Sequence, residues 1–257
     1  MTTSKTVPWT DVAPETDVGF EVPGTGTHIT ASLCGKPMCG TMIYTPPFVT
    51  SFPKLSSDIE DPKHENLEVV KRATLSVDLT MKGAGSLQKD FRDWMDAVDD
   101  KLLDFMMKPE NVRLFGKPGL SREAMKALQK RQFRTRISSK TGKQYEDSMS
   151  CHCKAFWTQG MRHNQTFGRN TVPVFMSDDG SVVQANEAYE TPNPVPYGST
   201  VAVCLRYDGP YCSPSQYFGN SWSLISVRYY GSSAVAPDVT DVLMFPALKA
   251  ADFPIAV

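Results

Sequence analysis

The sequence of 257 residues lacks the features that mark membrane-spanning and secreted proteins. It has no uninterrupted apolar run long enough to cross a bilayer, and no charged start followed by an apolar signal segment. We therefore expect a soluble intracellular protein that is neither secreted nor bound to a membrane. Apolar residues make up 40% of the chain, which is enough for a core.

Catalytic motifs are also missing. Gly116-Lys117-Pro118-Gly119 has neither the spacing nor the hydroxyl of a phosphate-binding loop. Gly83-Ala84-Gly85 lacks the third glycine of a dinucleotide fingerprint. The four histidines follow no spacing typical of a nucleophilic site. Asp99-Asp100 and Asp178-Asp179 are expected at the solvated surface, on a helix and in a turn. We expect no enzymatic activity and no cofactor.

The six cysteines leave one alternative open. A zinc site joining Cys34 and Cys39 to Cys151 and Cys153 is an alternative, but neither cluster has the two-residue spacing of a zinc knuckle. Without a secretory signal, free buried thiols that pack as small hydrophobic side chains are the expected state.

What the chain does contain is a basic segment without acidic residues. Its cations are Lys126, Lys130, Arg131, Arg134, Arg136, Lys140 and Lys143. The whole chain has 27 basic and 28 acidic residues, so charge is segregated here despite a net charge of −1. Segregation of this kind produces a local positive field.

The basic segment follows the pattern of two strands joined by a turn. Residues 132–137 and 145–157 alternate in period two, and residues 138–143 have the composition of a turn. If the two strands pair, one side of the sheet should carry Arg134, Arg136, His152 and Lys154. The opposite, buried side should carry Phe133, Ile137, Cys151 and Cys153.

A sheet face that is both cationic and aromatic suits single-stranded nucleic acid. Cations follow the phosphates, and rings stack on unpaired bases at about 1–3 kcal/mol per base. The candidate DNA-binding residues are Lys130, Arg131, Arg134, Arg136, Lys140, Lys143, Tyr145, His152, Lys154, Phe156 and Trp157. Phe133 is the weakest stacking candidate, because its expected face is the core side. The alternative interpretation is the ordinary solvated face of an antiparallel sheet.

The remaining sequence predicts many short strands and two helices. Strands are expected at residues 67–81, 171–176, 200–207 and 222–229, the third ended by Asp208-Gly209-Pro210. Apolar spacings of three and four predict a long helix from Ser86 to about Met107, and Ser121 is the expected N-cap of a shorter basic helix. This pattern predicts a mainly β fold with inserted helices, a closed or nearly closed antiparallel barrel. We expect a flexible arm at 1–30, one domain at 31–230 and a tail at 231–257.

Four segments carry a resemblance to a known family. They are Tyr44-Thr45-Pro46-Pro47-Phe48, the strand at Leu75–Leu79 with the helix to Met107, Phe133-Arg134-Thr135-Arg136 before Tyr145, and Val201 with the run from Tyr217 to Val227. In this order they resemble the OB-fold single-stranded-DNA-binding proteins of phages and of large DNA viruses of algae and amoebae. The resemblance covers roughly Met42 to Tyr229.

The resemblance implies an OB-like barrel that binds single-stranded DNA in viral replication or recombination, in the nucleus or the cytoplasm, with replication proteins as partners. Phage members typically end in an acidic tail that contacts those partners. This chain departs from them, because residues 237–257 contain only three aspartates and one lysine. An alternative is a structural or virion protein that forms homo-oligomers by exchanging its arm and tail. An enzyme acting on nucleic acid is a third alternative, without a motif to support it.

Overall fold

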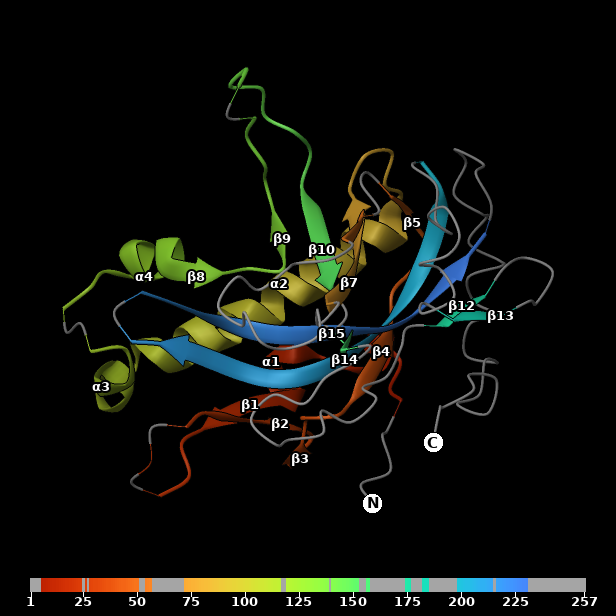
Figure 1. The fold of residues 1–257 in the computed structure, drawn as a ribbon. Coiled ribbons are helices and arrows are strands. Elements are labelled where there is room, and N and C mark those ends of the chain that lie inside the picture. The colour runs from red at the N-terminus through yellow and green to blue at the C-terminus, as the bar shows by residue number, and fades with distance from the viewer. Residues whose placement is uncertain are drawn as a thin grey trace, which may run out of the picture. The chain divides into compact units, whose positions relative to one another are not determined.

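The structure is a computed structural model and describes most of the chain. The described residues are 6–24, 26, 28–50, 54–56, 72–116, 119–138, 140–152, 156–157, 174–176, 182–184, 198–214 and 216–230. Figure 1 shows the fold as a ribbon. The chain divides into two compact units. Unit 1 consists of Met1–Ile43, Gly85–Met149 and Arg206–Trp222, and unit 2 of Tyr44–Ala84, Ser150–Leu205 and Ser223–Val257.

Unit 1 is built around helix α2 (Ser86–Met107), which has the predicted bounds. The Gly85 N–H donates to Gln88 Oε1 at 3.0 Å, which satisfies one of the free backbone donors at the start of the helix. The helix ends at Met107 because Pro109 disfavours a helical conformation at Lys108. None of the described helices is long and apolar enough to cross a bilayer.

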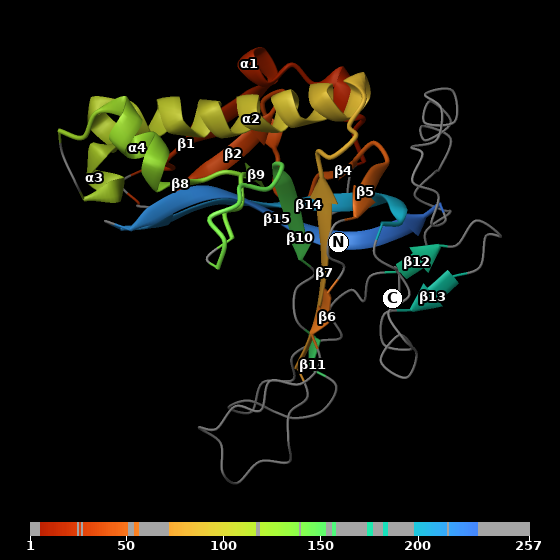
Figure 2. The ribbon, with the colours of Figure 1, turned by 90° about the horizontal axis from the view of Figure 1, so that it is seen from above.

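The N-terminal part of unit 1 packs on α2. It comprises η1 (Trp9–Asp11), α1 (Pro14–Asp17), β1 (Val18–Glu21), β2 (Thr30–Leu33) and β3 (Lys36–Pro37), and the strands form one antiparallel sheet. Both α1 and β1 lie against α2 (Figure 2). The Trp94 indole N–H donates to Val12 O at 2.9 Å, and the Trp9 ring meets Phe91 edge-on. The expected division of the chain into arm, domain and tail stays a prediction.

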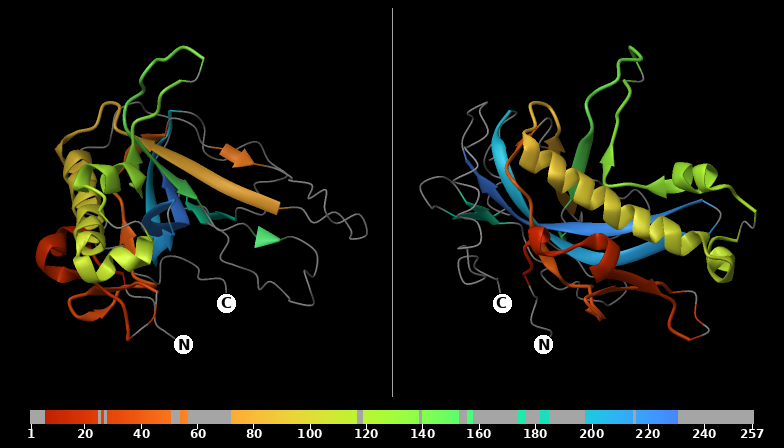
Figure 3. Two further views of the ribbon diagram at one scale, coloured as in Figure 1. Left: turned by 90° about the vertical axis from the view of Figure 1, so that its left-hand side faces the viewer. Right: turned by 180° about the vertical axis from the view of Figure 1, so that it is seen from behind.

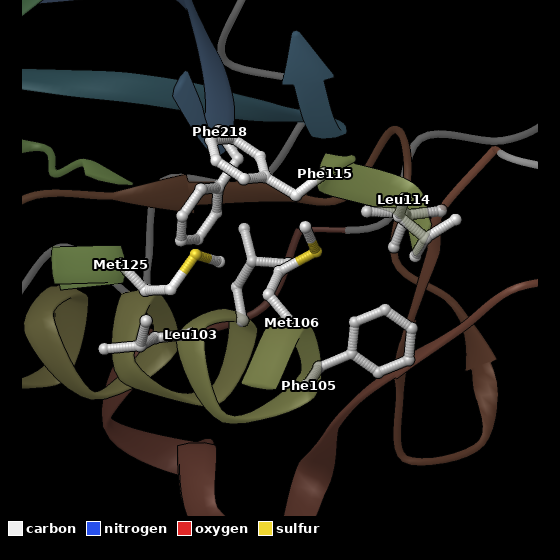
Figure 4. Close-up of a cluster of buried hydrophobic side chains, with 9 residues drawn as sticks. Leu103, Phe105, Met106, Leu114, Phe115, Met125 and Phe218 are labelled. Carbon is white, nitrogen blue, oxygen red and sulfur yellow. The ribbon is translucent and has the colours of Figure 1, made fainter. Parts of the chain in front are cut away.

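A buried hydrophobic cluster of unit 1 lies at the C-terminal end of α2 (Figure 4). Helix α2 is followed there by η2 (Pro109–Asn111), α3 (Val112–Phe115) and α4 (Arg122–Leu128). The buried cluster consists of Ile29, Leu102, Leu103, Phe105, Met106, Leu114, Phe115, Met125 and Phe218. Ser121 caps α4 as predicted, because its Oγ accepts from Ala124 N at 3.2 Å.

Strands β14 (Thr200–Ser213) and β15 (Tyr217–Tyr229) form a long hairpin that contributes to both units. The prediction that Asp208-Gly209-Pro210 ends the first strand is wrong. Gly209 has a φ of 122°, which only glycine adopts without strain, and Pro210 removes the ladder donor at its own position only. In unit 1, β15 pairs in parallel with β8 (Gln129–Lys130), and β9 (Phe133–Arg134) pairs with the start of β10 (Ser148–His152).

Unit 2 is a sheet. Its strands are β5 (Phe48–Thr50), β6 (Lys54–Ser56), β7 (Arg72–Thr80), β11 (Phe156–Trp157), β12 (Val174–Met176) and β13 (Val182–Gln184), with parts of β4 (Met42–Tyr44), β10, β14 and β15. The order is β13-β12-β15-β14-β5-β7-β10, with β6 and β11 also on β7. Strand β12 pairs with β15 in parallel, whereas the pairs β11–β7, β12–β13, β14–β5, β5–β7 and β6–β7 are antiparallel.

The chain is mainly β with inserted helices, as the sequence predicted. The predicted closure into a barrel is not seen in the described strands of unit 2, because their order has two ends, β13 and β10. Strand β9 covers only part of the expected strand at 132–137, and the expected strand at 145–157 is divided between β10 and β11.

Candidate nucleic-acid interface

A buried carboxyl group on α2 fixes the start of the basic segment. Asp99 is 1% exposed, and its two oxygens accept from Asn220 Nδ2 at 2.8 Å and from Gln132 N at 3.1 Å. The Tyr207 hydroxyl donates to Asn220 Oδ1 at 2.7 Å, and Gln129 Nε2 donates to Asp99 O. Gln129–Gln132 is thereby bound to both α2 and β15.

The burial of Asp99 overturns the expectation of a solvated helix face at this position. Period-three-and-four spacing located the apolar stripe of α2 correctly but could not show that Asn220 and Gln132 would cover this polar position. Burial raises the pKa of Asp99 to about 7, against the effect of its two hydrogen bonds. Burial also raises the pKa of Tyr207.

Arg131 is neutralised within unit 1. Its guanidinium pairs with Asp96 at 3.1 Å and with Asp100, one turn apart on α2, and its side chain is 18% exposed. Desolvation by burial raises the pKa of Asp96, and the nearby Arg131 and Arg92 oppose that rise. Because Arg131 already binds two carboxylates, we leave it out of the interface proposed below.

Strands β9 and β10 pair in the predicted antiparallel sense, with Arg134 opposite Ser148 and Phe133 opposite Met149. Phe133 and Met149 are buried, at 5% and 1% exposed, while Arg134 is exposed and its Nε donates to Arg131 O at 2.6 Å. The prediction that Ile137 is buried is wrong, because its exposed fraction is 68%. The chain leaves the core after Arg134. The period-two alternation of apolar residues continues to Ile137, but this part of the strand does not pack against the core.

Residues 135–147, which we call the basic hairpin, extend away from α2 and α4 (Figures 1 and 3). Ile137 lies opposite Gln144, and Tyr145 N donates to Arg136 O at 2.8 Å, so Arg136 lies opposite Tyr145. Since Arg134 lies opposite Ser148, Thr135 alone faces both Glu146 and Asp147. This one-residue slip is a β-bulge.

The bulge determines which side of the basic hairpin Tyr145 occupies. Without it, alternation from buried Met149 would put Tyr145 on the side of Phe133. With it, Tyr145 shares a side with Arg136 and is 47% exposed. The Lys143 ammonium lies 6.0 Å from the centre of the Tyr145 ring, within cation–π range. We call Arg136, Lys143 and Tyr145 the cation face of the hairpin.

A second group, which we call the tyrosine surface, comprises Lys130, Arg134, Tyr211 and Tyr217. The Lys130 ammonium lies 5.4 Å from the centre of the Tyr217 ring, which is 39% exposed and meets Tyr211 edge-on at 6.1 Å. Burial raises the pKa of Tyr211, and the nearby positive charge of Arg134 opposes the rise. Arg134 ends β9 and directly precedes the basic hairpin in the sequence.

Sequence reasoning missed both tyrosines of this surface, since Tyr211 and Tyr217 lie some 80 residues after Lys130 along the chain. A usable signal was Gly219, opposite Lys130 in the ladder. A Cβ atom at Gly219 would lie 2.7 Å from Lys130 O and 3.0 Å from the Tyr211 hydroxyl, so a side chain there would force β8 and Tyr211 away from β15.

The described residues bring only part of the predicted set together. Lys130, Arg134, Arg136, Lys140, Lys143 and Tyr145 are all exposed in unit 1. In contrast, β11, which contains Phe156 and Trp157, pairs with Arg72–Ala73 of β7 in unit 2. The backbone of His152 ends β10, whereas Lys154 and the side chains of His152, Phe156 and Trp157 lie outside the described part.

The cysteines and acidic residues show no metal site in the described residues, where no group of three or more ligands of the His, Cys, Asp and Glu type is gathered. Cys151 and Cys204 are free and buried, as predicted, and burial raises the pKa of the Cys151 thiol. Cys34 and Cys39 are free but exposed, so the prediction of burial is wrong for them. Cys153 and Asp178-Asp179 lie outside the described residues.

Comparison with known proteins finds a structural likeness but no match in sequence. No protein-family model matches the chain, and no curated protein matches its sequence. Among solved structures, the chain matches the crystal structure of gp2.5, a single-stranded DNA binding protein encoded by bacteriophage T7, with a TM-score of 0.40 and 10% identity. The match covers 77% of this chain and 95% of gp2.5. A likeness at this level carries no function to this chain, so function has to be argued from its own residues.

Proposed function

We propose that the chain binds single-stranded DNA, with little sequence preference, on the cation face of the basic hairpin and the adjoining tyrosine surface. One observation carries the proposal. Both exposed tyrosines of the described chain, Tyr145 and Tyr217, have a lysine ammonium within about 6 Å of the ring centre. Exposed rings offer faces for unpaired bases, and the ammonium groups beside them offer charge to the flanking phosphates.

The charge balance of this surface favours a polyanion. In the part of the chain that the structure describes, no carboxylate pairs with Lys130, Arg134, Lys140 or Lys143. Arg131, by contrast, is paired with two carboxylates. An ordinary solvated sheet face mixes charges of both signs, whereas here the acids of α2 neutralise one cation and leave its neighbours exposed.

Stacking and phosphate contact also account for the proposed lack of sequence preference. Every base has a π-face that a tyrosine ring can contact, and phosphates are the same along the strand. Bases in a duplex are already stacked, so single strands are the better ligand. Through the family resemblance, we extend the proposal to a role in viral DNA replication or recombination, with replication proteins as partners.

Titration of labelled oligo-dT at low and moderate salt tests the proposal. We expect binding at low salt that weakens steeply as salt is added, because bound phosphates release counterions. The double variant Arg134→Glu/Arg136→Glu should lose most of the affinity while its melting temperature stays close to wild type. Failure of the wild-type protein to bind at low salt overturns the proposal.

A matched pair of tyrosine variants tests the stacking contribution. Tyr145→Leu/Tyr217→Leu removes both rings, and each lost stacking contact should cost about 1–3 kcal/mol of binding free energy. Tyr145→Phe/Tyr217→Phe keeps the rings and should bind as the wild type does. Equal affinity of the two doubles would contradict stacking. If light scattering shows a large assembly that does not respond to added oligonucleotide, the result would instead favour the alternative of a structural protein that forms homo-oligomers.

A further inference from the structure

The basic hairpin has two chemically different sides. Residues directly opposite each other in an antiparallel pair share a side, and successive residues alternate. Arg136 and Tyr145 therefore lie on one side, and Ile137 and Gln144 on the other. Ile137 is 68% exposed, the largest exposed fraction among the large hydrophobic side chains of the described chain. A cationic, aromatic side is thus backed by a side on which Ile137 is exposed beside Gln144.

The hairpin is held in a defined position on unit 1. Ser138 N donates to Lys143 O at 2.9 Å, and Gly142 N donates to Ser138 O at 2.8 Å, which closes the turn. At its base, Asp147 accepts from the Thr135 hydroxyl and pairs with Arg92 of α2 at 2.6 Å. Ile137 therefore lies on a hairpin that these hydrogen bonds and this ion pair hold in place, and that extends from the rest of unit 1.

We propose that the basic hairpin is a wedge that opens DNA at the junction between single and double strands. This inference rests on the proposed function: one strand lies along the cation face, and Ile137, on the opposite side, packs against the first base pair of the duplex. Apolar side chains, isoleucine among them, can insert at a base step and partly unstack it. The hairpin then lies between the two strands and keeps them apart.

Charge argues against a second copy of the chain as the partner of Ile137. In a symmetric contact through Ile137, each of the two hairpins would carry Arg136, Lys140 and Lys143 within one eight-residue stretch, so two ribbons of the same charge would lie close together even though Arg136 and Lys143 are on the side away from Ile137. Like charges at that spacing repel, whereas a DNA junction supplies phosphates on both sides of the hairpin. The surroundings of Ile137 therefore suit DNA better than protein of the same charge.

The test uses a forked duplex with a fluorescent adenine analogue in the base pair at the junction, together with oligo-dT. Wild-type protein should raise the fluorescence of the fork, because the analogue brightens when it unstacks. Ile137→Ser should lose about ten-fold in the protein concentration needed for this signal, the loss of an apolar wedge, while binding oligo-dT as before. The conservative variant Ile137→Leu should open the fork as the wild type does.

Each other outcome decides against the wedge or against the proposed function. If Ile137→Ser opens the fork as well as the wild type, the wedge is wrong. If Ile137→Ser loses oligo-dT binding to the same extent, Ile137 is a single-strand contact and the wedge is also wrong. If the wild type is a dimer in gel filtration and Ile137→Ser is a monomer, a second copy of the chain occupies the Ile137 side, and the wedge is wrong. Fork opening by a wild-type protein that does not bind oligo-dT would support the wedge and overturn the proposed function.

Discussion

Gln129–Gln132 and the cations of the basic hairpin belong to one acid-free run of sequence, Lys126–Lys143, yet they have opposite surroundings. In the first stretch, Arg131 is held by Asp96 and Asp100 of α2, and Asp99 binds the Gln132 backbone. In the second, Lys140 and Lys143 are exposed and pair with no carboxylate in the described part of the chain. Asp147, at the base of the hairpin, accepts from the Thr135 hydroxyl and pairs with Arg92 of α2.

The difference shows what a run of charges in a sequence can and cannot predict. A run records neighbours along the chain, whereas Coulomb energy depends on distance in space. The carboxylates that neutralise Arg131 come from residues 31 and 35 positions earlier. The sequence alone therefore does not distinguish a cation that pairs within the fold from a cation that remains available to a ligand. The position of α2 makes that distinction.

The largest expected effect is on the free energy of unfolding. It distinguishes Phe133 from Ile137, two apolar residues that alternation places on the same side of the strand. Phe133 is buried against Phe91, at 6.4 Å between ring centres, so Phe133→Ala should cost about 3–5 kcal/mol of unfolding free energy. Ile137→Ala should change it by less than about 0.5 kcal/mol, because most of the side chain is already in water. Urea unfolding of both variants measures the two values, and similar losses would contradict the described path of the hairpin.

The second prediction concerns the pH dependence of the anchoring stretch. The folded-state pKa of Asp99 is raised to about 7, above its ordinary value, so the folded state binds this proton more tightly than the unfolded state. The resulting stability is fully present below about pH 4 and is lost as the pH rises through about 7, at up to about 1.4 kcal/mol per pH unit.

Asp99→Asn isolates this contribution, because asparagine has the shape of the protonated acid but does not titrate. The unfolding free energy of the wild type minus that of Asp99→Asn should fall between about pH 4 and about pH 8. Taking this difference reduces the contributions of nearby Asp96, Asp100, Arg131 and Tyr207, which face Asp99 or its partners. A difference that rises with pH would mean that burial does not raise the pKa of Asp99.

The third prediction compares two cations, of which Arg131 should contribute to stability and Lys143 to DNA binding. Arg131→Ala leaves two partly buried carboxylates without their partner and should cost about 1–2 kcal/mol of unfolding free energy, discounted for their partial exposure. Lys143→Ala should leave stability within about 0.5 kcal/mol and weaken oligo-dT binding instead. The two variants should therefore show opposite patterns in urea unfolding and in oligo-dT titration. The same pattern in both would remove the distinction between anchoring and binding cations.

Local physics explains which features could be predicted from the sequence. The bounds of α2 follow from its apolar spacing and from Pro109, and the cap of α4 follows from Ser121, all within one stretch of chain. The pairing of β9 with β10 was also predicted, because alternation and an intervening turn specify a hairpin. These signals involve residues that are close in the sequence.

The features that could not be predicted depend on contacts between distant segments. Asp99 is buried because Asn220 and Gln132 meet there, and Tyr217 joins the candidate site because β8 pairs with β15. The bulge opposite Thr135 moves Tyr145 to the other side of the hairpin through a one-residue slip that composition does not reveal. Ile137 was assigned to the core because alternation gives the side of a strand but not where the second layer ends.

The smallest expected effect is on the salt dependence of binding, and it distinguishes free cations within unit 1. Lys130→Gln and Lys140→Gln each remove one charge that we propose contacts a phosphate. The slope of log affinity against log salt for oligo-dT should therefore become shallower by about 0.7 for each variant. Lys36→Gln is the matched control, because Lys36 is an exposed lysine of β3, outside both the hairpin and the tyrosine surface. Its slope should equal that of the wild type. Exposed lysines contribute little to folding, so all three variants should keep the wild-type melting temperature. If the slope changes equally for Lys36→Gln and Lys140→Gln, exposed lysines outside the basic hairpin contact phosphate as much as those within it, and the proposed location of the site is wrong.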